Sequence, residues 1–234
     1  LFFITVLLRM GRGCIITCSP KVGLPSRACI LAVFGVGLPS AITTFLFDMD
    51  YVVIDKLMVS YHDLALAAVG IVLKVERFPL NVGLGICQGM VPLVAYNYSA
   101  GNGERTNQVI RLSIRLGLLV AAISIVLYEL FAVQLAHVFI SDTQTVDLAA
   151  QFLRIRVLAT PLMFISFFTV HLFQAFGKGR VALFLGVSRW LGLNIPMLFL
   201  LNHLIGMFGI VWSQITAGGC VLSQGCALTR RATV

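Results

Sequence analysis

Long apolar stretches separated by short polar ones dominate the chain and predict membrane-spanning helices. Residues 28–47 carry no charged side chain, residues 78–103 carry none, and residues 190–229 carry none over 40 positions. About 20 apolar residues suffice for a helix to cross a hydrocarbon core of about 30 Å. The last stretch is too long for one helix and suits two, with a break between Asn202 and Gly206.

Charged residues, prolines and turn residues mark where the predicted helices begin and end. The six predicted helices span about 29–54, 65–98, 109–131, 148–176, 182–201 and 207–228. Residues 1–27 are expected to be the end of a preceding helix followed by a cytoplasmic loop, as in a fragment of a longer protein. We therefore expect an all-α, polytopic membrane protein whose six-helix transmembrane bundle occupies residues 28–234.

Composition and charge placement support a membrane protein. Hydrophobic residues make up 59% of the 234 residues and charged residues only 11%, against about 25% charged residues in an average soluble domain. If successive loops alternate sides, eleven Lys and Arg residues lie on the side of the C-terminus. Three lie on the other side, namely Lys56, Arg154 and Arg156. Because basic loops stay in the cytoplasm, the C-terminus is expected there.

Motifs for other functions are missing from the sequence. The six cysteines lie in apolar segments without a CxxC pair, so we interpret them as packing residues and expect no metal site. No HExxH or GxSxG motif is present, so we expect no enzyme. No basic run with interleaved aromatics indicates nucleic-acid binding.

A polar stripe runs along the second predicted helix. At about 100° per residue, four of its side chains fall within about 60° of one another. They are Lys74, Arg77, Asn81 and Gln88. Glu76 points about 160° away from Lys74, which predicts pairing with another helix or exposure to a water-filled cavity. The functional interpretation is a transport pathway or coupling-ion site; the alternative is structural ion pairing, with Lys74 and Arg77 extending to the membrane interface.

Two further side chains are candidates for proton transfer. Asp48, near the end of the first predicted helix, is the strongest acid: burial would let it exchange a proton near neutral pH, and clustered oxygens would favour Na⁺. The alternative for Asp48 is a carboxylate in a loop, if the first predicted helix ends before it. Asp50 faces nearly the opposite side and is expected to be solvated or paired. His171 lies deep in a span, either as a proton carrier or in a hydrogen-bonded packing role.

Two local motifs concern helix packing and capping. Gly85 and Gly89 form a GxxxG motif, with Gly83 beside it, and we expect it to allow close helix packing. Asp147 is a candidate N-cap for the fourth predicted helix.

Several segments together resemble a known transporter family. They are GLPSA at the start of a span, ALAAVGIV, GxxQGMVPLVAYNYSAGNGER and FQAFGKGRVALFLGVSRWLGLNIPMLFLL, across residues 29–229. They resemble the C-terminal half of multidrug and toxic compound extrusion (MATE) transporters, particularly the MepA-like bacterial branch. This family has twelve helices in two six-helix bundles and exports cationic amphiphilic drugs in exchange for Na⁺ or H⁺.

The resemblance implies that this chain is one lobe, helices 7 to 12, in a bacterial cell membrane. It then needs a missing N-terminal six-helix half, the lipid bilayer and small organic cations as partners, and no cofactor beyond the coupling ion. Asp48 occupies approximately the place of an acid in helix 7, and Glu76 and Arg77 would face the cavity from helix 8. Some branches of the family carry an acid in helix 10, but residues 157–177 contain none. This argues against a Na⁺ site of that kind and leaves proton coupling open.

Two other functions remain alternatives. One is a lipid-linked sugar flippase of the same superfamily, which would need more cationic residues along its cavity. The other is a membrane-embedded binding or assembly module without transport activity. Binding assays that compare organic cations with lipid-linked substrates distinguish the flippase from the drug transporter. Reconstituted transport by the chain would reject the binding or assembly module.

Overall fold

The computed structural model describes residues 26–232 and, within them, helices and no strand. The chain divides into residues 1–35 and residues 36–234. The first nine residues of α2 fall in the first part, and the fold described below is that of the second. The expected end of a preceding helix and most of its loop, residues 1–25, lie outside the described residues.

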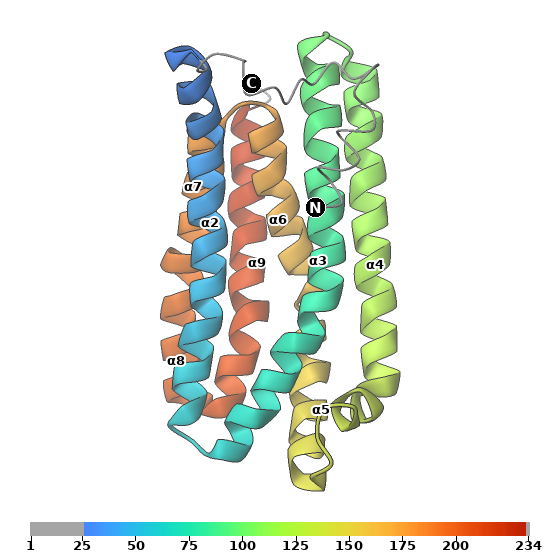
Figure 1. Ribbon diagram of the computed structural model, residues 1–234, viewed down its shortest axis with the longest axis vertical. Coiled ribbons are helices and arrows are strands. Elements are labelled where there is room, and N and C mark those ends of the chain that lie inside the picture. The colour runs from blue at the N-terminus through green and yellow to red at the C-terminus, as the bar shows by residue number, and fades with distance from the viewer. Residues whose placement is uncertain (1–25, 233–234) are drawn as a thin grey trace, which may run out of the picture. The chain divides into compact units, whose positions relative to one another are not determined.

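All six predicted helices are present (Figure 1). The first three are α2 (Arg27–Val59), α3 (Asp63–Ser99) and α4 (Gly103–His137). The fourth is divided between α5 (Thr143–Val157) and α6 (Thr160–Ala175). The fifth comprises α7 (Gly179–Val187), the π-helix η1 (Ser188–Asn194) and α8 (Ile195–Ile205), and the sixth is α9 (Met207–Ala232). Among the described residues, α2, α3, α4, the segment Gly179–Ile205 and the bent α5–α6 pair are long and apolar enough to cross a membrane, and α9 is not among them.

The fourth predicted helix is broken next to a proline. α5 and α6 meet at an angle of 46°, and Pro161 lies in the first turn of α6, where its missing N–H leaves no hydrogen bond unmade. The fifth, Gly179–Ile205, is continuous, and Pro196 is the second residue of α8, which directly follows η1. Pro161 therefore interrupts the fourth pass, as its position inside the predicted helix indicated.

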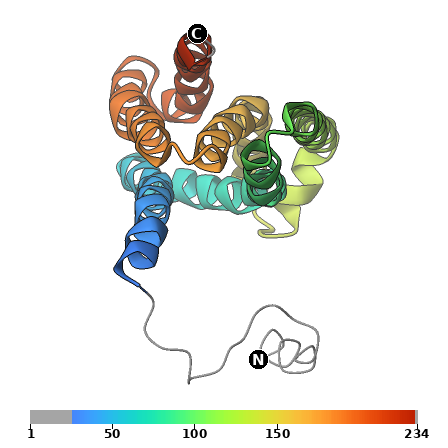
Figure 2. The ribbon, with the colours of Figure 1, turned by 90° about the horizontal axis from the view of Figure 1, so that it is seen from above.

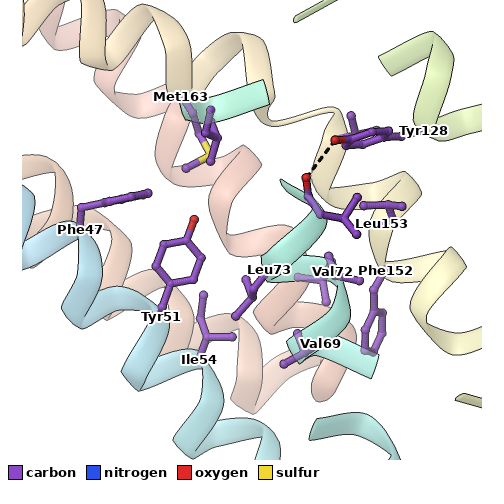
Figure 3. Packing of buried hydrophobic residues seen from close by; sticks show 14 of the residues in the cluster. Phe47, Tyr51, Ile54, Val69, Val72, Leu73, Tyr128, Phe152, Leu153 and Met163 are labelled. Atoms are coloured by element: carbon purple, nitrogen blue, oxygen red, sulfur yellow. Dashed lines mark hydrogen bonds between the residues drawn. The ribbon is translucent and has the colours of Figure 1, made fainter. Parts of the chain in front are cut away.

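α6 is the central helix of the bundle. It packs against α3, α4, α7 and α9, and the view from above shows it between α3 and α9 (Figure 2). The apolar core combines side chains from α2 to α6, η1, α8 and α9, and Figure 3 shows part of it. They include Phe47, Tyr51 and Ile54 of α2, Val69, Val72 and Leu73 of α3, Tyr128 of α4, Phe152 and Leu153 of α5, and Met163 of α6.

Close helix packing depends on glycines other than the expected GxxxG pair. A Cβ placed at Gly85 or Gly89 would meet nothing within 4 Å in the described structure, so the packing role expected of that motif is wrong for this bundle. A Cβ at Gly83, by contrast, would lie 3.1 Å from the Phe164 ring of α6. At Gly117 of α4, a Cβ would overlap the same ring, which lets α4 and α6 approach closely.

The N-cap of α5 is Asp142 and not Asp147. The backbone N–H and the hydroxyl of Thr145 donate to Asp142 Oδ2 over 3.0 and 2.6 Å. These hydrogen bonds stabilise the carboxylate and hold the pKa of Asp142 below its ordinary value. Asp147 lies within the second turn of α5, one turn too late to cap it.

The lowered pKa of Asp142 predicts a pH dependence of stability. Because the folded state favours the carboxylate, the cap contributes stability above about pH 4 and loses it as the pH falls further. An Asp142→Asn variant keeps a capping oxygen that does not titrate. We expect the melting temperature of the unmodified protein to fall relative to this variant between about pH 5 and pH 3. A constant difference over that range would contradict the prediction.

Candidate functional site

Glu76 and Arg156 form a buried ion pair between α3 and α5. Arg156 Nε donates to Glu76 Oε2 over 2.6 Å, and both side chains are at most 2% exposed. Glu76 lies on the buried face of α3 with Val72 and Val75, which confirms that it points away from Lys74 and pairs with another helix. Within the described residues, the two Nη atoms of Arg156 and Glu76 Oε1 have no hydrogen-bond partner.

Asp50 is the buried acid of α2. It is 1% exposed and accepts hydrogen bonds from Asn194 Nδ2 in η1 over 2.6 Å and from Gln214 Nε2 in α9 over 2.7 Å. The carboxylate thus connects three helical passes. Its burial corrects the expectation that Asp50 could be solvated, although the expectation that it is paired is confirmed.

Asp48 is exposed, contrary to the burial that made it the strongest candidate acid. Its Oδ1 lies 3.0 Å from Arg77 Nη2, and about half of each side chain is exposed. The Arg77 guanidinium also lies 4.8 Å from the centroid of the Tyr51 ring. α2 continues to Val59, so Asp48 lies within a helix and not in a loop. Asp50 lies two positions after Asp48, which places the two side chains about 160° apart around the helix.

Arg189, located in η1, is a fourth buried charge. Its guanidinium lies 4.8 Å from the Trp190 ring centroid and 6.0 Å from that of Phe167. The side chain is buried, and its Nη atoms have no hydrogen-bond partner in the described part of the chain. π-helical turns occur frequently at functional sites. Asn194, which binds Asp50, belongs to the same seven-residue segment.

A small polar cavity brings together two of the predicted substrate residues. Gln88 of α3 and His171 of α6 line a cavity of about 100 Å³, together with Ser40, Thr43 and Thr44 of α2. His171 Nδ1 lies 2.8 Å from the carbonyl oxygen of Phe167, a contact that fits its packing role. Phe47 and Phe167 supply an aromatic wall in addition to the hydroxyl groups of α2, so the cavity has both apolar and polar lining.

The other residues of the polar stripe do not line this cavity. All four stripe residues are exposed on α3, as expected for one face of a helix. Lys74, however, lines a separate groove between α3 and α4, and Arg77 pairs with Asp48. The four stripe residues therefore lie on one face of α3, but within the described residues they do not line one cavity.

Four functional candidates were missed by sequence reasoning: Arg156, Arg189, Asn194 and Gln214. The charge pattern of the loops places Arg156 on the outer side, but the residue lies buried in α5. Arg189 could have been noticed because it is a charged residue within an otherwise uncharged pass. Asn194 and Gln214 are neutral and carry no comparable signal. In the described part of the chain, no three His, Cys, Asp or Glu side chains are grouped as a metal site would require.

Comparison with known proteins identifies similar sequences. A family model described as MatE matches residues 27–200. The multidrug export protein MepA of Staphylococcus saprophyticus is 31% identical over 217 residues, which is 93% of this chain and 47% of the relative. MepA of Staphylococcus aureus is 26% identical over the same shares. The chain thus spans about half the length of the curated relatives it matches.

Solved structures share the fold. An outward-facing multidrug resistance MATE family transporter of the MOP superfamily superposes with a TM-score of 0.84 at 19% identity, over 97% of this chain and 52% of that one. A mutant of the Vibrio cholerae MATE transporter VcmN superposes with a TM-score of 0.83 at 22% identity, over 99% of this chain and 52% of that one. The bundle of this chain therefore has the fold of half of each of these proteins.

Proposed function

Because the chain belongs to the MatE family, we propose that it is one six-helix half of a multidrug efflux antiporter that exports cationic amphiphilic drugs in exchange for H⁺ or Na⁺. The other half is a second six-helix bundle, and alternating access arises as the two bundles rock against each other. The protein acts in the bacterial cell membrane, with the C-terminus in the cytoplasm. Arg156 is buried, so only Lys56 and Arg154 of the expected three basic residues remain on the outer side.

The observation that carries this proposal is the set of buried charges inside membrane-spanning helices. A charged side chain at the centre of a membrane helix costs roughly 2.5–3.5 kcal/mol on insertion scales. Glu76, Arg156, Asp50 and Arg189 are all buried in such helices. Intramembrane ionisable groups that face the interior of a bundle mark ion pathways and proton relays.

Asp50 is the strongest candidate for the coupling acid. Its two hydrogen-bond donors are neutral amides, so protonation of the carboxylate leaves no directly bonded cation without a partner. Glu76 is bound directly to Arg156, and its protonation would leave that guanidinium unpaired. Asp48 and Glu76 remain proposed coupling residues from the sequence, and Asp50 joins them from the structure. We propose a proton as the coupling ion, taken up by the carboxylate from outside and released inside.

The cavity beside Gln88 and His171 is the proposed substrate contact of this half. Its volume of about 100 Å³ is below the roughly 300–1,000 Å³ of cavities that enclose a drug-sized ligand. We therefore propose that it holds one part of the drug while the second half encloses the rest. The aromatic wall and the hydroxyl groups supply apolar and polar contacts to an amphiphilic cation.

Substitution of Asp50 tests the coupling proposal. In the protein that contains both halves, we expect Asp50→Asn to abolish ethidium efflux driven by a pH gradient, because the amide cannot carry the proton. Asp48→Asn is the matched neighbour and is expected to have a smaller effect, since Asp48 is exposed and its partner Arg77 is too. Normal efflux by Asp50→Asn at normal expression would reject Asp50 as the coupling acid.

A second measurement tests the transporter itself. The 234-residue chain, alone or co-expressed with a preceding six-helix half, is reconstituted and assayed for organic-cation transport. Transport that needs both halves is the expected result. No transport with both halves present would favour an assembly module, and transport of lipid-linked sugars in place of organic cations would favour a flippase.

A further inference from the structure

An apolar groove lies between α3 and α4, on a part of the surface not used by the proposed transport site. Its volume is about 590 Å³, within the roughly 300–1,000 Å³ typical of small-molecule sites. Phe78 and Val82 of α3 line one wall, and Leu127 and Val138 belong to the other. All four side chains are at least 40% exposed, so the groove opens outward from the bundle.

The shape of the groove follows from the geometry of α4. At Phe131 the backbone leaves the helical region (φ −114°, ψ 18°), and α4 bends there. Residues before and after the bend line the groove. At its floor, the Tyr128 hydroxyl donates to the carbonyl oxygen of Val75 over 2.9 Å (Figure 3). This hydrogen bond fixes α3 and α4 relative to each other, so the groove is preformed.

Lys74 supplies a single cation at the edge of this apolar surface. Its side chain is exposed, lines the groove, and has no ion-pair partner among the described residues. Because no acidic side chain lines the groove, the charge of Lys74 attracts an anionic group there and repels an organic cation. The groove is therefore unsuited to the cationic drugs proposed above.

Lys74 also lies close enough to the membrane surface for its side chain to reach a lipid headgroup. α3 has 37 residues and is thus about 55 Å long, against about 30 Å of hydrocarbon. If α3 is centred in the bilayer, roughly 12 Å extends beyond each edge. Lys74 lies about three turns, or about 16 Å, from the start of α3 at Asp63. It is therefore about one turn inside the hydrocarbon edge, and lysine side chains extend over such distances to reach the headgroups.

We propose that the α3–α4 groove binds one anionic phospholipid of the leaflet in which α3 begins. An acyl chain lies along the apolar walls at Phe78 and Leu127, and the lipid phosphate binds the Lys74 ammonium. The three supporting features are independent of the coupling proposal: a preformed apolar groove, one unpaired cation at its edge, and the depth of that cation. The site selects anionic over zwitterionic lipids because only the former bring a net negative charge to Lys74.

Photocrosslinking in nanodiscs tests the proposal. The purified protein is reconstituted with phosphatidylglycerol or phosphatidylcholine that carries a diazirine in the acyl chain, and labelled peptides are mapped by mass spectrometry. We expect phosphatidylglycerol to label residues 74–82 and 120–139 about fivefold more than phosphatidylcholine, the effect of one basic side chain near an anionic lipid. Lys74→Glu removes this preference, whereas Lys56→Glu, an exposed lysine in the last turn of α2, preserves it.

A second variant tests the groove without changing charge. Leu127→Trp fills the groove from a side chain that is 46% exposed and is expected to reduce labelling by both lipids. Equal labelling by the two lipids, or unchanged selectivity in Lys74→Glu, would overturn the proposal. Displacement of phosphatidylglycerol by ethidium would identify a drug site instead, and no labelling of these segments would show that protein covers the groove. Both results reject a lipid site.

Discussion

Replacement of Glu76 with alanine is expected to destabilise the protein by about 3–5 kcal/mol, the usual cost of leaving one charge of a buried ion pair without its partner. Arg156 is 1% exposed, and its bond to Glu76 Oε2 is the side-chain hydrogen bond that the structure records for it. Removal of Glu76 therefore leaves a guanidinium buried without compensation between α3 and α5. Denaturant titration in detergent micelles measures the loss.

The double variant Glu76→Met with Arg156→Met separates the charge from the packing. Replacing both members of a buried pair with apolar side chains of similar size is often neutral or stabilising. We expect the double variant to recover most of the stability lost in Glu76→Ala. If it also transports normally, Glu76 is structural and not a coupling residue. A double variant as unstable as the single one would contradict the role assigned to charge pairing.

Introduction of a methyl group at Gly117 is expected to cost about 1–3 kcal/mol, the usual effect of overpacking a well-packed interface. A Cβ at this position would overlap the Phe164 ring, and both residues are buried where α4 packs on α6. Relief requires that the ring or one of the helices move. Measurement of the free energy of unfolding of Gly117→Ala checks this prediction.

Two variants control the Gly117 experiment. Gly85→Ala also exchanges a helical glycine for alanine, but nothing lies within 4 Å of the added Cβ, so we expect no loss and up to about 1 kcal/mol of gain from helix propensity. Phe164→Leu combined with Gly117→Ala should recover part of the lost stability, because the smaller side chain makes room. Equal effects of Gly85→Ala and Gly117→Ala would contradict the packing explanation.

The helices themselves could be predicted because membrane insertion imposes a local rule. Backbone polar groups in hydrocarbon must be satisfied within the same segment, so an apolar run of sufficient length forms a helix. The predicted end of the third helix at residue 131 coincides with the bend of α4 at Phe131, although α4 itself continues to His137. The largest differences from the predicted ranges are therefore at helix ends, which lie in polar surroundings where no such rule applies.

The candidate site was only half predictable, and Asp48 and Asp50 show why. Both acids lie in the same apolar segment, and helical periodicity places them on nearly opposite faces. Which face is buried depends on Asn194 and Gln214, more than 140 positions away in the chain. Periodicity assigns relative directions but no absolute one, so the wrong acid was expected to be buried.

By itself, the sequence determined the class of protein, the six helices and the direction of Glu76 away from Lys74, because length, hydropathy and helical periodicity act within one segment. Only the tertiary structure decided that Arg156 is the partner of Glu76, that Asp50 is buried and that Gly117 rather than Gly85 is a packing glycine. It also separated the groove at Lys74 from the cavity at Gln88. These features arise from contacts between helices, whose strength depends on burial and distance between residues far apart in the chain.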